Sequence, residues 1–186
     1  MSQLIVDQTR KITPFSPHSN LPLLEFQSLK TARGYTPPTL EGVLQWLNST
    51  EAQHLFFIID FKITDPETAK ELIQAVESQG LLNRAVFESP SPKVAGMIEK
   101  LRPEIVTAIY PKNMLLMRHY LKKYHIDIAS YYYPVANPLS IWLIHRKGKK
   151  VLIWTINSPG KAIWFAQMNV DGMMTDNPKI FLPDKK

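Results

Sequence analysis

Short apolar runs alternate with amphipathic stretches along most of this chain. The apolar runs predict six strands, at residues 55–62, 84–88, 105–110, 126–131, 151–156 and 170–174. Apolar residues at helical spacing predict helices at residues 40–48, 64–79, 92–101, 113–123, 138–146 and 159–168. Thr39 is a suitable N-cap for the first of these helices. Strict alternation of strand and helix predicts right-handed βαβ units and a parallel sheet.

The repeating strand–helix unit favours a (β/α) barrel. A doubly wound nucleotide-binding sheet is less well supported, because the chain has no glycine-rich phosphate loop. A complete barrel has eight strands and about 250 residues, whereas this chain has 186 residues and a seventh candidate strand at residues 4–7. We therefore predict one α/β domain over residues 1–186: a TIM barrel of about six to seven βα units, incomplete at the N-terminus. Residues 8–38 are proline-rich and lack a sustained period, so we predict an excursion there.

The first predicted strand of the barrel ends in two charged residues. In residues 55–62 five apolar residues precede Asp60 and Lys62, and such a run is typical of a strand that is buried on both faces. Side chains alternate along a strand, so both charges point to the same side at its carboxyl end. Ligands of α/β folds bind at this end. Two interpretations stay open, a strand-end ion pair without chemistry and a functional site.

The composition of the chain argues against nucleic-acid binding, cysteine chemistry and a membrane span. The net charge of +6 comes from 22 Lys and Arg against 16 Asp and Glu, and these are too dispersed to predict a nucleic-acid partner. The chain has no cysteine, which excludes disulfides and thiolate chemistry. No apolar run approaches the ~20 residues of a membrane span. The first residues lack the features of a signal peptide, so we expect a cytoplasmic protein.

Four segments carry a family resemblance. They read PTLEGVL at 38–44, IIDFK at 58–62, VLIWTIN at 151–157 and VDGMMTDNP at 170–178. In this order they resemble motifs of the glycerophosphodiester phosphodiesterase family. The resemblance implies a TIM barrel that hydrolyses glycerophosphodiesters to glycerol 3-phosphate and an alcohol. It also implies Ca²⁺ or Mg²⁺ held by carboxylates, with two histidines as general acid and base.

The resemblance assigns expected roles to several residues. Asp60 corresponds to a metal-binding glutamate of the family, and Lys62 to its phosphate-facing lysine. Trp154 corresponds to an aromatic residue that lines the substrate mouth, although a tryptophan of the barrel core is an equal alternative. Asn157 and Asp176 are expected to stabilise loops, because Asx side chains bond nearby backbone.

The family's first catalytic elements are missing from this sequence. The chain contains neither His-Arg-Gly nor Glu-x-Asp, and residues 6–9 resemble a His-Asp motif with Val6 in place of the second catalytic histidine. His18 alone could reach the mouth, from the proline-rich excursion. The other four histidines are expected to be exposed or to pack against helices; they are His54, His119, His125 and His145.

We therefore expect a phosphodiester hydrolase of lipid metabolism by family, but no activity and little metal binding by this chain as it stands. The alternative is a non-catalytic barrel remnant that binds a phosphorylated small molecule or another protein. Its open strand edges could then pair in a homo-oligomer.

Overall fold

The computed structural model describes residues 28–30, 34–36, 38–62, 66–111 and 113–181. Contacts divide the chain into two units, one of residues 7–54 and one of residues 1–6 with 55–186. In the smaller unit, helix α2 spans Leu40–Leu47, and the Thr39 hydroxyl accepts a hydrogen bond of 3.1 Å from the Gly42 N–H, as predicted. The predicted strand at 4–7 and most of the excursion at 8–38 lie outside the described residues. The single-domain organisation stays a prediction.

The larger unit contains a sheet of six parallel strands in the order β1-β2-β3-β4-β5-β6. The strands are β1 Phe57–Asp60, β2 Ala85–Ser89, β3 Val106–Ile109, β4 Ile128–Tyr132, β5 Lys150–Trp154 and β6 Gly172–Met173. Parallel strands that follow one another in chain order form the wall of a (β/α) barrel. The six strands make a half-barrel, which confirms the predicted incomplete TIM-barrel fold.

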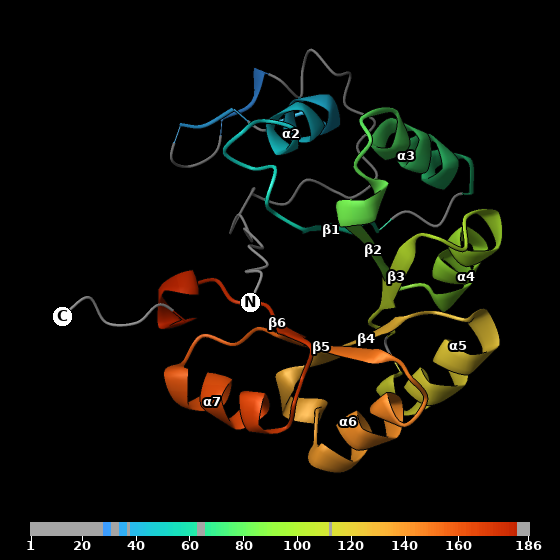
Figure 1. Cartoon of the computed structure of the whole chain (residues 1–186), viewed down its shortest axis with the longest axis vertical. Coiled ribbons are helices and arrows are strands. Elements are labelled where there is room, and N and C mark those ends of the chain that lie inside the picture. Colours follow the sequence, from blue (N-terminus) through green and yellow to red (C-terminus); the bar gives the residue numbers. More distant parts are fainter. Residues whose placement is uncertain (1–27, 31–33, 37, 63–65, 112, 182–186) are drawn as a thin grey trace. The chain divides into compact units, whose positions relative to one another are not determined.

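Helices α3 to α7 cover the outer side of this sheet (Figure 1). They are α3 Pro66–Ser78, α4 Pro92–Leu101, α5 Met117–Tyr124, α6 Pro138–His145 and α7 Pro159–Gln167. Four of them begin with proline, whose fixed φ suits the first helical position. Short 3₁₀ turns accompany them: η1 Leu82–Arg84, η2 Met114–Leu116, η3 Tyr133–Val135 and η4 Pro178–Phe181.

Alternation along the strands separates two apolar layers. The outer layer joins Ile109, Ala129 and Ile153 to buried residues of helices α4 to α7. The inner layer consists of Ala108, Ile128, Leu152 and Met174, with Ile58, Val86 and Trp154 packed against them. Gly172 has a packing role in this layer, because a Cβ atom there would lie 2.5 Å from Leu152 Cδ2.

Three details differ from the sequence predictions. Strand β1 is shorter than predicted and only half-buried, because it pairs with β2 alone among the described strands. Strand β6 has only two residues, although hydrogen bonds from Asp171 N to Val151 O (3.0 Å) and from Met174 N to Ile153 O (2.8 Å) extend its pairing. The helix predicted at 113–123 starts as the 3₁₀ turn η2. Among the described residues, no helix has the length and apolarity needed to cross a membrane.

Candidate functional site

The inner face of the half-barrel changes from apolar to polar at the carboxyl ends of its strands. Asp60 and Glu88 are paired in register on β1 and β2. Each polar or aromatic residue at this edge stands two positions after an inner-layer residue, which places it on the same face of the sheet. The set comprises Asp60, Glu88, Tyr110, Ser130 and Trp154.

Asp60, Lys62 and Tyr110 form one connected cluster. The Lys62 ammonium donates to Asp60 Oδ2 at 2.6 Å, and the Tyr110 hydroxyl donates to Asp60 Oδ1 at 2.7 Å. The ammonium also donates to the Tyr110 hydroxyl and lies 4.7 Å from the centre of its ring. The Asp60 and Lys62 side chains are 40% and 64% exposed. The ion pair predicted as one interpretation therefore exists, but it adds little stability at this exposure and it is open to a ligand.

Glu88 lies beside this cluster in a much drier environment. The residue is 5% exposed, and its Oε1 atom has no hydrogen-bond partner among the described residues. The pKa of Glu88 is raised to about 7, chiefly by burial and to a lesser extent by the charge of Asp60, while the Ser130 hydroxyl and Lys62 act to lower it. The Ser130 hydroxyl lies near enough to the Glu88 carboxylate to act against the rise in its pKa. Even so, neither Ser130 Oγ nor Glu88 Oε1 has a partner with hydrogen-bonding geometry among the described residues. Buried polar atoms of this kind are rare and call for a structural or functional reason.

Aromatic rings line the mouth next to these charges. The Trp154 ring lies 6.0 Å from the Tyr110 ring and 5.2 Å from the Tyr132 ring, measured between centres. Trp154 is half-buried and also packs against the inner apolar layer. It therefore has features of both predicted roles, mouth and core. Burial raises the pKa of Tyr110 above its usual range, and the bond to Asp60 adds to this effect, so its hydroxyl stays a proton donor.

Asn157 and Asp176 fasten the loops that follow β5 and β6. Asn157 Oδ1 accepts from the Asp176 N–H at 2.9 Å and from the Thr175 hydroxyl at 3.1 Å, and its amide donates to Asp176 Oδ2 at 2.8 Å. The Asn157 side chain thus bonds to the neighbouring loop, as the sequence predicted for a loop-stabilising residue.

The histidines described in the larger unit lie away from the mouth. His145 contacts Asp171 at 3.0 Å, and Asp171 also accepts from the Val151 N–H at 2.8 Å, at the amino ends of β5 and β6. His119 on α5 packs against the Tyr120 ring, and His125 follows α5 with φ 60°. Val6 and His18 lie outside the described residues, so the expectations for them stay predictions.

The described carboxylates do not by themselves form a metal cage. In the part of the chain that the structure describes, no three His, Cys, Asp or Glu side chains come together. Asp60 and Glu88 are hard oxygen donors, but Asp60 is already bonded to Lys62 and Tyr110. These residues alone do not fit a resident Ca²⁺ or Mg²⁺, which takes six or more oxygen ligands. The predicted metal role of Asp60 stays a prediction.

Glu88 and Tyr110 were missed by the sequence reasoning. Each stands at the carboxyl end of a predicted strand, at residues 84–88 and 105–110, as Asp60 does in the strand before them. The rule that drew attention to Asp60 would therefore have found both. They were overlooked because neither lies in one of the four family-like segments.

Fold and site together define a (β/α)-barrel protein with a cluster of charged and aromatic side chains at the carboxyl edge of its sheet. A family model matches residues 6–180, and the chain belongs to the glycerophosphoryl diester phosphodiesterase family.

Individual relatives agree with this assignment. The chain is 26% identical over 178 residues to YhdW of Bacillus subtilis (strain 168), whose name places it among the glycerophosphodiester phosphodiesterases; the match covers 88% of this chain and 71% of YhdW. A glycerophosphodiester phosphodiesterase from Parabacteroides distasonis has a similar structure, with a TM-score of 0.72, 23% identity and coverage of 83% of this chain and 66% of that one. A phosphodiesterase from Oleispira antarctica in complex with sn-glycerol-3-phosphate is also similar, with a TM-score of 0.65 and 20% identity. This match covers 85% of this chain and 68% of that one. The chain thus spans about two thirds of these structures.

Proposed function

We propose that the cluster at the carboxyl edge is the phosphate-binding half of a glycerophosphodiester phosphodiesterase site. The observation that carries the proposal is the contact of Lys62 with Asp60 and Tyr110, in a chain of this family. The exposed ammonium is a donor suited to phosphate oxygens and would exchange part of its pairing with Asp60 for the ligand. Support comes from the Oleispira antarctica relative, which was solved with sn-glycerol-3-phosphate.

The neighbouring residues suit the rest of such a ligand. Trp154 and Tyr132 would flank the glycerol carbons, because aromatic faces cover apolar surface at little entropic cost. Tyr110 would hold Lys62 in place and remain protonated while doing so. Asp60 and Glu88 are the carboxylates nearest to this position, and they could hold a divalent cation only together with oxygen ligands that the described part of the chain does not supply. With two carboxylates we expect Ca²⁺ and Mg²⁺ to bind only with dissociation constants of roughly a millimolar or weaker.

For the 186-residue chain by itself we expect binding without turnover. Hydrolysis needs a base for the attacking oxygen and an acid for the leaving oxygen. At the carboxyl edge of the described sheet the only group with a pKa near neutrality is Glu88, and it is buried. This observation also favours the alternative of a non-catalytic phospho-ligand-binding protein. Pairing of open sheet edges between two copies stays a prediction of that alternative.

Two measurements test these proposals separately. Calorimetric titration with sn-glycerol 3-phosphate should show binding that Lys62→Gln weakens about tenfold, as expected for a lost charge-assisted contact. Lys70→Gln is a matched control, because Lys70 forms a similar exposed ion pair with Glu67 on α3 (2.7 Å). Equal losses in the two variants would contradict a specific phosphate site.

Incubation with glycerophosphocholine and Ca²⁺ or Mg²⁺ tests activity. We expect no release of glycerol 3-phosphate, whereas turnover that Asp60→Ala abolishes would show a working hydrolase and exclude the non-catalytic alternative.

A further inference from the structure

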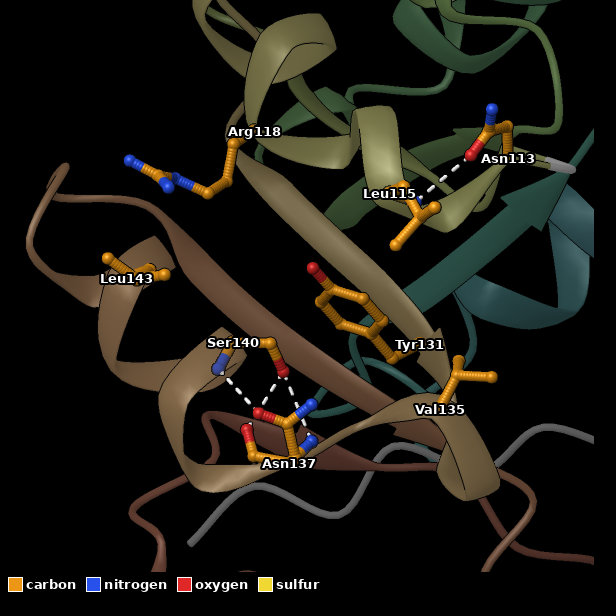
Figure 2. Close-up of a pocket in the computed structure, with 8 residues that line it drawn as sticks. All are labelled: Asn113, Leu115, Arg118, Tyr131, Val135, Asn137, Ser140 and Leu143. Atoms are coloured by element: carbon orange, nitrogen blue, oxygen red, sulfur yellow. Dashed lines mark hydrogen bonds between the residues drawn. The ribbon is translucent and has the colours of Figure 1, made fainter.

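A pocket lies outside the barrel wall, between helices α5 and α6. It has a volume of about 490 Å³ and is lined by residues of η2, α5, β4, η3 and α6 and of the segments beside them. Figure 2 shows the Tyr131 ring between the helix that carries Arg118 and the helix that carries Ser140 and Leu143. This volume falls in the range of pockets that hold small organic ligands, about 300–1,000 Å³.

Strand β4 separates this pocket from the barrel mouth. Tyr131 and Tyr132 are consecutive strand residues, so their side chains point to opposite faces of the sheet. Tyr132 stacks on Trp154 at the mouth, whereas Tyr131 belongs to the outer layer and lines the pocket. A ligand in the pocket would therefore not touch Asp60 or Lys62.

Tyr131 is the most unusual residue of this pocket. The residue is only 4% exposed, yet its hydroxyl has no hydrogen bond to another described residue and points into the space between the helices (Figure 2). Burial raises the pKa of Tyr131 to about 12, partly offset by the positive charge of Arg118. The hydroxyl is therefore protonated at neutral pH and can donate to an acceptor on a ligand in the pocket.

Three other polar side chains around the pocket, Arg118, Asn113 and Asn137, can donate to a ligand, whereas the Ser140 hydroxyl already donates to the Asn137 carbonyl at 2.8 Å. Arg118 has no ion-pair partner in the described part of the chain. Asn113 Oδ1 already accepts from the Leu115 N–H (3.1 Å) and Asn137 Oδ1 from the Ser140 N–H (2.9 Å), which leaves the amide N–H groups of both available. A guanidinium, a phenol and two amides together form a set of donors that matches an anionic ligand.

Three apolar side chains complete the lining together with Ser140. Leu115 and Val135 are 94% and 47% exposed at the rim, and Leu143 lies half-buried on α6. A leucine exposed to this degree gains free energy when a ligand covers it. The pocket thus offers donors for a charged head and apolar surface for a short chain.

We propose that the pocket between α5 and α6 binds a small amphiphilic anion, a carboxylate or phosphate monoester with a short apolar chain. Tyr131 and Arg118 bind the charged head, and Leu115, Val135 and Leu143 contact the chain. The site is independent of the proposed phosphate site at the barrel mouth.

Titration with hexanoate, hexyl phosphate and 1-hexanol, followed by NMR or calorimetry, tests this proposal. Both anions should bind at least about tenfold more tightly than the neutral alcohol, because only they accept from the guanidinium. Arg118→Gln should remove this preference, and Tyr131→Phe should weaken anion binding about threefold. Arg118 is exposed, so its replacement leaves the fold intact even where Tyr131→Phe does not.

Two controls locate the binding. Arg146→Gln removes another exposed arginine, which stacks on Trp142 of α6, and should leave hexanoate binding unchanged. Lys62→Gln removes the cation at the barrel mouth and should also leave it unchanged. Equal affinity for anion and alcohol, no binding at about 10 mM ligand, or loss of hexanoate binding in either control variant would overturn the proposal.

Discussion

The two ends of the sheet both carry clusters of charged residues, and the two clusters differ in how well their polar groups are paired. At the amino end, the Thr107 hydroxyl donates to Glu99, the Thr107 N–H donates to Asp127 (3.2 Å), and Lys149 contacts Asp127 at 3.4 Å. At the carboxyl end, Glu88 and Ser130 keep buried oxygen atoms that have no partner in the described part of the chain.

Glu88 and Glu99 both have pKa values raised chiefly by burial, so the pKa alone does not distinguish the two ends. Satisfied polar groups fix the strands in place, whereas unsatisfied ones mark the end where a ligand is expected.

Replacing Glu88 gives the largest expected effect. Glu88 binds more protons in the folded than in the unfolded protein between its two pKa values, so stability falls as the pH rises from 4.5 to about 7. This shift corresponds to about 3 kcal/mol at most. Glu88→Gln should therefore raise the free energy of unfolding at pH 8 by up to about 3 kcal/mol and leave it nearly unchanged at pH 4.

Urea denaturation at the two pH values measures this difference. Part of the wild-type pH dependence should remain in Glu88→Gln, because the raised pKa of Glu99 acts in the same direction, and the double variant with Glu99→Gln should remove it. If the free energy of unfolding depends on pH in both variants as it does in the wild type, folding shifts the pKa of neither carboxyl group.

Aspartate replacements at the two ends should differ in stability. Asp127→Ala leaves the N–H of the fully buried Thr107 without its acceptor and should cost about 2 kcal/mol. Asp60→Ala breaks an exposed ion pair and should cost less than about 1 kcal/mol. Chemical denaturation at pH 7 compares them. A larger loss for Asp60→Ala would mean that the mouth cluster serves the fold and not a ligand.

Removing one hydroxyl at each end should give the smallest effects and the sharpest contrast. Tyr110→Phe removes the bonds to Asp60 and Lys62 and should weaken binding of sn-glycerol 3-phosphate about threefold. Thr107→Val removes a bond to Glu99 at the other end and should lower stability without changing this binding. Calorimetry and thermal unfolding of the same two samples provide the check. Weaker binding of sn-glycerol 3-phosphate by Thr107→Val would contradict the view that the amino-end cluster serves stability alone.

The sequence predicted the strand order and nearly all elements because each βα unit carries its own pattern. Helix α4 matches its predicted range of 92–101, since Pro92 at its first position defines the start. The prediction that β1 is buried on both faces was wrong, because an apolar run does not reveal whether a strand has one neighbour or two.

Within the site, Asp60 and Lys62 were found because they interrupt an apolar strand. Glu88 ends its strand in the same way and could have been found by the same rule, but its burial beside Asp60 and Ser130 depends on neighbouring strands and leaves no local pattern. The Tyr131 pocket was not predicted either, because it needs two helices and a strand in fixed positions.

The sequential strand order has a consequence for how such a protein can change. Each strand–helix unit is bonded to the unit before it and the unit after it, as in repeat proteins, where stability is close to a sum of local and nearest-neighbour terms. Units can then be gained or lost at one end while the register of the others is kept. The cluster of Asp60, Glu88 and Tyr110 is built by three adjacent units, so it can be kept as a block when units are gained or lost at the other end.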